Sequence, residues 1–276
     1  MSTREPRNVP DGDIAPSRLA ELAVDLADRA GRLMLRHRAA GFSVDTKSSV
    51  TDVVTDADRA VESFLINELD RLRPGDAVLG EEGGQAAESR SGIRWVIDPI
   101  DGTVNFMLGL PQFAVSIAAE VDGVVVAGCV HNPVSADMFW AALGGGAFLG
   151  DRRLTGPRSV PLDQAVVATG FGYDARHRAR QGEVLARLLG RVGNMRRLGS
   201  AALDLCALGA GWVDLYYEGP LGEWDFAAGA LVAAEAGARL SGLNGRPPGP
   251  WLVAGAHPDQ ADEFFSMLVE YGADRA

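Results

Sequence analysis

Trp95-Val96-Ile97-Asp98-Pro99-Ile100-Asp101-Gly102-Thr103 is the stretch of this 276-residue chain that decides most about its fold. The apolar run at its start predicts a buried strand. Pro99 disfavours helical backbone before it and removes one amide donor. We therefore expect a sharp turn at the strand end, with Asp98 and Asp101 free to converge. Gly102 permits a tight backbone, and Thr103 stands where a helix N-cap or a hydroxyl ligand would be useful. Such paired carboxylates suit a hard cation that prefers oxygen ligands, for example Mg²⁺.

Helical and strand periodicities follow one another on both sides of this stretch. The mixture of helices, strands and hairpins predicts an α+β or layered α/β architecture. The expected helices cover 17–38, with Ser17 as a possible N-cap, a segment capped by Thr55 with Val61, Phe64, Leu65 and Leu72 on its buried face, 177–192, a segment from the cap Ser200 to Leu208, 224–237 and 258–271. The expected strands cover 77–79, 115–121, 124–130, 138–142, 166–169, 214–217 and 252–254.

The composition is that of an ordinary globular protein, with 47% hydrophobic and 23% charged residues. The net charge of −11 argues against a nucleic acid or an anionic membrane as the main partner. It leaves an anionic substrate open, because bound cations can invert the local field. The sequence contains no run of roughly 18 apolar residues, so we expect no membrane span. Residues 1–16 lack the apolar core of a signal peptide, so we expect a disordered tail and a cytoplasmic protein whose two cysteines are buried thiols.

Four acidic residues stand at the ends of expected elements: Glu81, Asp98, Asp101 and Asp225. Taken singly, Asp225 is typical of a helix N-cap and Glu81 of a solvated loop acid. Taken together, they cannot share a pocket without cations, because two like charges about 4 Å apart repel by roughly 4 kcal/mol at an effective dielectric near 20. If the fold brings them together, we expect two or more Mg²⁺ ions, one of them bridged by Asp98.

The motifs of this chain resemble those of the inositol monophosphatase family of Mg²⁺-dependent, lithium-sensitive phosphatases. The similar segments occur in family order between about Leu19 and Phe265. They are Gly80-Glu81-Glu82, Asp98-Pro-Ile-Asp101-Gly-Thr103-Val-Asn105-Phe106, Trp224-Asp225-Phe-Ala-Ala-Gly229, Lys47-Ser-Ser with Asp52 to Asp58, Gly199-Ser200-Ala201, and Tyr217-Glu218. The resemblance implies a layered αβαβα sandwich over residues 17–276, with halves of about 17–150 and 151–276, usually as a homodimer.

The same resemblance assigns roles to individual residues. Glu81, Asp98 and the Ile100 carbonyl would hold the first Mg²⁺, Asp98, Asp101 and Asp225 the second, and a third, weaker ion would depend on Glu81. Thr103 would orient the attacking water, with Asp58 behind it. From the residues alone, a simple cap for Thr103 and a helix-dipole acid for Asp58 remain open.

Substrate contacts follow from the resemblance too. The amides of Gly102 and Thr103 would face the phosphate at a helix start. Glu218 would accept hydrogen bonds from inositol hydroxyls, although it could also be a plain acid at a strand end. The remaining residues expected around the substrate are Gly199, Ser200 and Ala201 on the ring side, Asp101 and Asp225, and Lys47 on a mobile loop, with a solvated surface lysine as the alternative for Lys47.

The resulting hypothesis is hydrolysis of myo-inositol 1-phosphate by in-line attack of water, without a phosphoenzyme. Family relatives with the same metal motif act on histidinol phosphate, fructose 1,6-bisphosphate or 3′-phosphoadenosine 5′-phosphate, and these remain alternatives. A nucleotide would require stacking aromatics and basic residues at the pocket, whereas the arginines of 176–187 are expected to form a solvated face. The four histidines are scattered, which disfavours zinc chemistry. A binding role with the transcription machinery is the alternative from another class.

Overall fold

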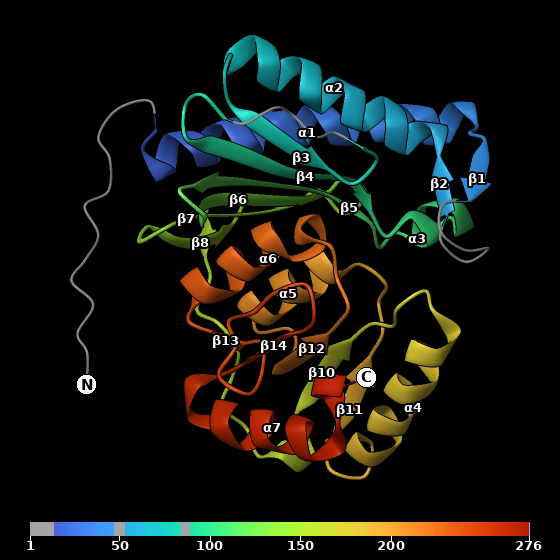
Figure 1. The fold of residues 1–276 in the computed structure, drawn as a ribbon, viewed down its shortest axis with the longest axis vertical. Helices are drawn as coiled ribbons and strands as arrows, with labels where there is room; N and C mark the ends of the chain where they lie inside the picture. Colours follow the sequence, from blue (N-terminus) through green and yellow to red (C-terminus); the bar gives the residue numbers. More distant parts are fainter. Residues whose placement is uncertain (1–13, 47–52, 84–88, 276) are drawn as a thin grey trace.

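Two β-sheets alternate with three layers of helices (Figure 1). The computed structural model describes residues 14–46, 53–83 and 89–275, so most of the expected N-terminal tail and Lys47 lie outside the described residues. The layer order confirms the αβαβα sandwich. From the top of Figure 1 the layers are α1 (Pro16–Ala40) with α2 (Asp56–Leu72), a seven-stranded sheet, α5 (Ala201–Gly209) with α6 (Glu223–Ala236), a five-stranded sheet, and α4 (Ala175–Leu188) with α7 (Pro258–Tyr271).

The seven-stranded sheet is a meander in which neighbouring strands pair in chain order. Only the first pair is parallel, and the hairpin at Asp122-Gly123 has positive φ at both residues, as predicted for a tight turn. Its strands are β3 (Ala77–Gly80), β4 (Ile93–Asp101), β5 (Ala114–Val121), β6 (Val124–Asn132), β7 (Asp137–Ala142), β8 (Gly146–Leu149) and β9 (Arg152–Arg153).

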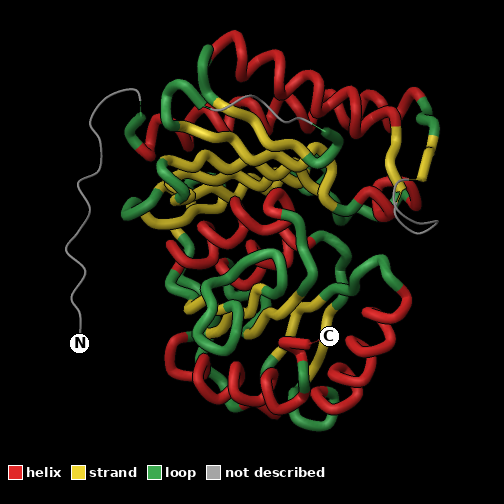
Figure 2. The backbone as a smooth tube through the Cα atoms, in the orientation of Figure 1, coloured by secondary structure: helices red, strands yellow, loops and turns green. Residues whose placement is uncertain are grey.

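The five-stranded sheet lies beyond the α5–α6 layer, and Figure 2 shows these two helices between the two blocks of strands. Its central strand β12 (Leu215–Glu218) pairs in parallel with β10 (Val166–Thr169) and antiparallel with β14 (Val253–Ala256). Strands β11 (Asn194–Arg196) and β13 (Arg239–Ser241) form the edges, and β1 (Val44–Thr46) pairs with β2 (Val53–Thr55) apart from both sheets.

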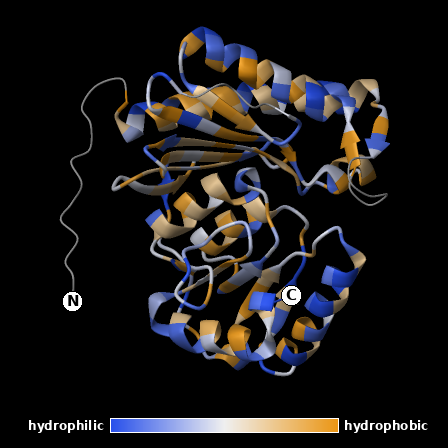
Figure 3. Cartoon of the chain, viewed as in Figure 1, coloured by the Kyte–Doolittle hydropathy of each residue, from blue (hydrophilic) through white to orange (hydrophobic). Residues whose placement is uncertain are grey.

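The strand β4 is buried on both faces, and Figure 3 shows strands of its sheet largely in hydrophobic colours. Trp95 and Ile97 belong to the core that includes α1 and α2, whereas Val96 packs in the core that includes α5 and α6. Because side chains alternate along a strand, Asp98 leaves β4 on the Val96 face, toward α6. The sheet therefore aims Asp98 at the middle helix layer.

Several local expectations require correction. The strand β4 does not end before Pro99 but continues to Asp101, with an irregular register opposite β5 where a regular ladder would need the missing proline amide. Helix α1 begins at Pro16, because a proline is favoured in the first helical turn, so Ser17 is not its N-cap. Leu72, at the end of α2, is exposed rather than buried. Among the described residues, no helix is both long and apolar enough for a membrane span.

Candidate active site

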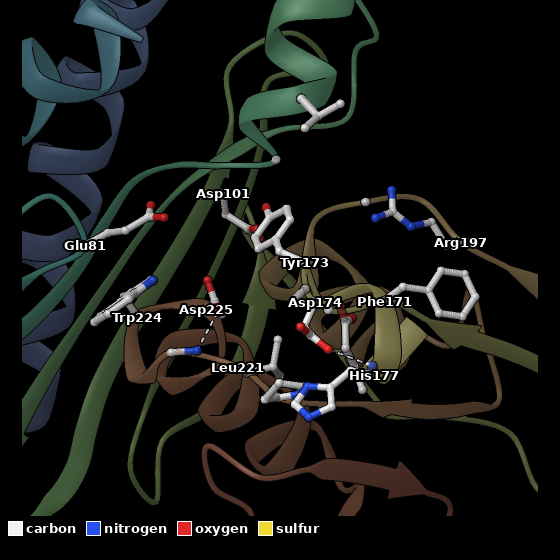
Figure 4. Close-up of a pocket in the computed structure, with 18 residues that line it drawn as sticks. Glu81, Asp101, Phe171, Tyr173, Asp174, His177, Arg197, Leu221, Trp224 and Asp225 are labelled. Carbon is white, nitrogen blue, oxygen red and sulfur yellow. Dashed lines mark hydrogen bonds between the residues drawn. The ribbon is translucent and has the colours of Figure 1, made fainter. Parts of the chain in front are cut away.

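Three carboxylates converge where β4 ends and α6 begins. Asp98, Asp101 and Asp225 each offer one oxygen, and these three oxygens lie within 4.8 Å of one another. Glu81, in the turn after β3, lines the same cavity, and Figure 4 shows Glu81, Asp101 and Asp225 on one side of it. The structure thus brings together the four acids that the sequence placed at element ends.

One oxygen of each converging carboxylate is held by the protein itself. The Ile100 amide donates to Asp98 Oδ1 at 3.0 Å, and the Gly222 amide donates to Asp225 Oδ2 at 2.6 Å. Asp101 Oδ2 accepts from Ser200 Oγ at 2.6 Å and from the Ala202 amide at 2.8 Å. These bonds fix the orientation of each carboxylate, so that one rigid side of a site for a cation is already formed in the protein.

Crowding of these acids makes the site strongly attractive to cations. Burial raises the pKa of Asp98 well above its ordinary value, and the charges of Glu81 and Asp101 raise it further. Burial, followed by the charges of Asp101 and Glu81, raises the pKa of Asp225 in the same way. Burial raises the pKa of Asp101 to about 6, against the hydrogen bonds from α5. A divalent cation would remove this repulsion, and carboxylate and carbonyl oxygens fit Mg²⁺.

The first turn of α6, which carries Asp225, is fastened to the seven-stranded sheet. Arg94 Nη2 on β4 contacts Glu120 Oε2 of β5 at 2.6 Å and Glu223 Oε2 of α6 at 2.5 Å. Ser116 Oγ on β5 donates to the Trp224 carbonyl at 3.1 Å. Because Arg94 stands on the strand that also carries Asp98, these contacts set the position of Asp225 relative to the other carboxylates.

Thr103 and Asp58 form a buried pair beside the cluster. The Thr103 hydroxyl lies 3.2 Å from Asp58 Oδ1 and 3.1 Å from the Ile100 carbonyl, both acceptors. Asp58 also accepts from the Thr55 amide and hydroxyl in the capping box of α2. The cap reading of Thr103 is wrong, because Gly102, with φ of +96°, is the N-cap of α3 (Thr103–Leu108). Because the Thr103 hydroxyl donates its hydrogen bond to Asp58 or to the Ile100 carbonyl, its oxygen can accept a further hydrogen bond.

Glu218 lies across the cavity on β12, where Tyr216 donates to its Oε2 at 3.2 Å. Burial and then the charge of Asp101 raise the pKa of Glu218 to about 7. Gly170 makes room for this carboxylate, since a Cβ there would lie 1.7 Å from Glu218 Oε1. Sequence reasoning missed Gly170, and also the buried Asp204 on α5, whose carboxylate has no hydrogen-bond partner among the described residues.

The cavity between the two halves has a volume of about 490 Å³. Gly199, Ala201 and Glu218 line it together with Glu81, Asp101 and Asp225, and Ser200 donates a hydrogen bond to Asp101 from outside the cavity. Pro220 to Gly222 also line the cavity, and the side that sequence reasoning missed is formed by Phe171, Gly172, Tyr173, Asp174, His177 and Arg197. Carboxylates at one end of such a cavity, opposite hydrogen-bonding groups, define a candidate metal-dependent hydrolytic site.

The comparisons with known proteins agree with this class. The inositol monophosphatase family model matches residues 15–270. The inositol-1-monophosphatase SuhB of Mycobacterium tuberculosis is 44% identical over 278 residues, covering 94% of this chain and 96% of that protein. The Nus factor SuhB of Escherichia coli is 37% identical over 229 residues, covering 82% and 86%. The crystal structure of the SuhB protein from Bartonella henselae has a TM-score of 0.84 at 34% identity, covering 91% and 98%.

The chain belongs to the inositol monophosphatase family, and it is a phosphatase of that family. The family model spans nearly all of the described residues, so the likeness includes both halves of the cavity.

Proposed function

We propose that this protein hydrolyses a phosphate monoester with Mg²⁺, and that its substrate is myo-inositol 1-phosphate. The observation that carries this proposal is a single cavity. Asp101 and Asp225 of the cluster with Asp98 line it, and so does Glu218. The relatives' names, inositol-1-monophosphatase among them, support the substrate. The first test is phosphate release from this ester with and without Mg²⁺.

The donor set divides between two ions. Glu81, Asp98 and the Ile100 carbonyl would hold one Mg²⁺, and Asp98, Asp101 and Asp225 a second, with a third, weaker ion at Glu81. When bound, Mg²⁺ supplies charge neutralisation for the phosphate and the leaving oxygen and lowers the pKa of a water. The hydrogen bonds to Asp98, Asp101 and Asp225 hold the ligands in place before the ion arrives.

Thr103 and Asp58 position the attacking water in this proposal. The Thr103 hydroxyl donates its hydrogen bond to Asp58, so the threonine oxygen is left to accept a hydrogen bond from the water. The amides of Gly102 and Thr103, at the start of α3, face the phosphate oxygens. No nucleophilic side chain is required, and attack by water gives alcohol and phosphate directly.

Glu218 recognises the alcohol in this proposal, because its carboxylate can accept from two neighbouring hydroxyls. Gly199, Ser200 and Ala201 line the ring side, and Lys47 remains an untested contact outside the described residues. The substrate panel comprises myo-inositol 1-phosphate, histidinol phosphate, fructose 1,6-bisphosphate, 3′-phosphoadenosine 5′-phosphate and glycerol 2-phosphate. A Mg²⁺-dependent preference for the inositol ester by tenfold, about 1.4 kcal/mol in transition-state binding, supports the assignment. A histidinol-led or flat profile would refute the inositol assignment and retain the phosphatase.

A binding role with the transcription machinery is the second candidate, favoured by the Escherichia coli relative named a Nus factor. If no phosphate is released from any ester, with or without Mg²⁺, the result would favour that role. A homodimer, lithium inhibition and cytoplasmic residence also remain proposals, and sedimentation and an inhibition curve with LiCl test the first two.

A further inference from the structure

Two loops enclose the side of the cavity that carries Glu218. The first loop, 171–174, follows Gly170, whose missing side chain leaves room for the Glu218 carboxylate. The second loop, 219–222, continues the chain directly after Glu218. Residues of both loops line the cavity, and Figure 4 shows side chains from both there. The positions of the two loops therefore determine the space beside the Glu218 carboxylate.

Gln181 of α4 joins the two loops through one side chain. Its Oε1 accepts a hydrogen bond from the Gly172 amide at 3.0 Å, and its Nε2 donates to the Gly219 carbonyl at 2.5 Å. Gln181 is only 5% exposed, so both bonds are shielded from water and are costly to leave unmade. Its side chain lies behind the loops and does not line the cavity.

Each loop also has an anchor of its own, and the two anchors lie on different elements. Arg178 Nη1 donates to the Tyr173 carbonyl at 2.6 Å, which ties the first loop to the beginning of α4. The Leu221 amide donates to the Pro250 carbonyl at 2.8 Å, which ties the second loop to the segment before β14. Gln181 therefore links two loops that are anchored separately.

We propose that Gln181 is a positioning residue for substrate specificity, which sets the distance between the two loops and so directs the Glu218 carboxylate toward the alcohol of the ester. A shift of either loop would change how Glu218 meets hydroxyl groups, because one loop follows its strand and the other follows the glycine beside its carboxylate. The inference rests on the proposed phosphatase function and adds to it a residue that does not touch the substrate.

The test compares two esters that share the scissile phosphate. The alcohol of myo-inositol 1-phosphate offers hydroxyls to Glu218, whereas the alcohol of p-nitrophenyl phosphate has none. We expect Gln181→Met to lower the ratio of kcat/KM for the inositol ester over the aryl ester by about tenfold, which equals about 1.4 kcal/mol. The fall should come mainly from a higher KM for the inositol ester.

Gln260→Met is the matched control. Gln260 is a buried glutamine on α7 whose side chain accepts from the Val160 amide at 3.1 Å and donates to the Val160 carbonyl. Neither Gln260 nor Val160 lines the cavity. The control thus loses the same kind of bonds without touching either loop, so its ratio should equal that of the unaltered protein.

The metal cluster should not respond to Gln181→Met. The anchor at Leu221 lies between Gly219 and Gly222, and the Gly222 amide holds Asp225, so the Mg²⁺ concentration for half-maximal activity should be unchanged. An equal fall for both esters would overturn the proposal, because Gln181 would then act on the shared phosphate chemistry or on the fold. An unchanged ratio would overturn it too.

A second variant covers the case in which Gln181→Met does not fold. Gln181→Glu keeps the acceptor for the Gly172 amide and loses the donor to the Gly219 carbonyl when it is ionised. Relative to the unaltered protein at the same pH, its ratio should fall as the pH rises. A ratio equal to that of the unaltered protein at every pH would contradict the proposal.

The outcome for the substrate is kept separate from the outcome for Gln181. If another ester of the panel is preferred, the inositol assignment fails, and that ester replaces myo-inositol 1-phosphate in the ratio. If no ester is hydrolysed, the phosphatase proposal fails and amide hydrogen exchange decides on Gln181. Exchange in both loops should then be faster in Gln181→Met than in Gln260→Met. Faster exchange in one loop alone, or in neither, would refute the link.

Discussion

Replacing Glu218 with glutamine should leave the stability of the metal-free protein nearly unchanged at acidic pH and raise it increasingly as the pH rises from 4.5 to about 7. Glu218 faces the cavity beside Gly170, and burial followed by the charge of Asp101 raises its pKa from 4.5 to about 7. An acid whose pKa is raised by folding contributes stability that is complete below its unfolded pKa and is lost as the pH rises through its folded pKa. The Glu218 carboxyl therefore lowers the stability of the metal-free protein progressively between pH 4.5 and about pH 7, and the loss is complete above that range.

The magnitude follows from the shift. A rise from 4.5 to about 7 corresponds to about 3 kcal/mol if the carboxylate is fully desolvated. Since the side chain borders a cavity open to solvent, screening reduces this to about 2 kcal/mol. Glutamine has nearly the same shape and can still accept the hydrogen bond from Tyr216, so the charge is the main change.

The assay is urea unfolding with EDTA at pH 4.5 and pH 8.5. We expect Glu218→Gln to match the unaltered protein at pH 4.5 and to exceed its free energy of unfolding by about 2 kcal/mol at pH 8.5. Glu263→Gln is the control, because Glu263 is exposed on α7. The same difference between Glu218→Gln and the unaltered protein at both pH values would refute the reasoning. It would mean that folding does not raise the pKa of Glu218.

Two further perturbations address the cluster itself. Asp98→Asn removes a proposed metal ligand and a crowded charge, so the metal-free protein should unfold at higher urea. Mg²⁺-dependent activity should fall by more than roughly a hundredfold, since a metal supplies several kcal/mol of transition-state stabilisation. Unimpaired activity would contradict the ligand assignment. Arg94→Met releases Glu223 and the first turn of α6, so the Mg²⁺ concentration for half-maximal activity should rise about fivefold. This factor corresponds to about 1 kcal/mol from partly exposed ion pairs. Arg158→Met, which breaks the ion pair with Asp214, is the control.

The parts of the fold that follow from local signals were predictable from the sequence. Thr55 and Ser200 cap α2 and α5, and α7 spans Pro258–Tyr271 as expected, because a cap or an apolar stripe is contained in the segment that it defines. The short strands β1 and β13 were missed. Three residues carry too little periodicity, and their pairing depends on the strand beside them.

The candidate site likewise has a part that local motifs predict and a part that depends on tertiary packing. Its acids were found through motifs, whereas their convergence depends on how α6 packs on β4, which no spacing within one segment reports. Phe171 and His177 were missed for this reason, since only the folded chain brings them to the cavity that Glu218 of β12 also lines. For residues 176–187 the sequence predicted only a solvated face of arginines. No local signal in the sequence set Arg197 apart from Arg196.

The small residues that follow Asp225 have a physical reason that links the motif to the site. A Cβ at Gly229 would lie 2.9 Å from the Ala202 carbonyl of α5, and one at Gly128 of β6 would lie 3.0 Å from the Ala228 Cα. Helix α6 therefore packs closely against α5 on one side and against the sheet on the other. Because Asp225 and Ala202 stand near the starts of these two helices, this close packing brings the Asp225 carboxylate of one helix next to the amide that holds Asp101 on the other. The Trp-Asp-Phe-Ala-Ala-Gly segment thus joins a proposed metal ligand to the packing that positions it.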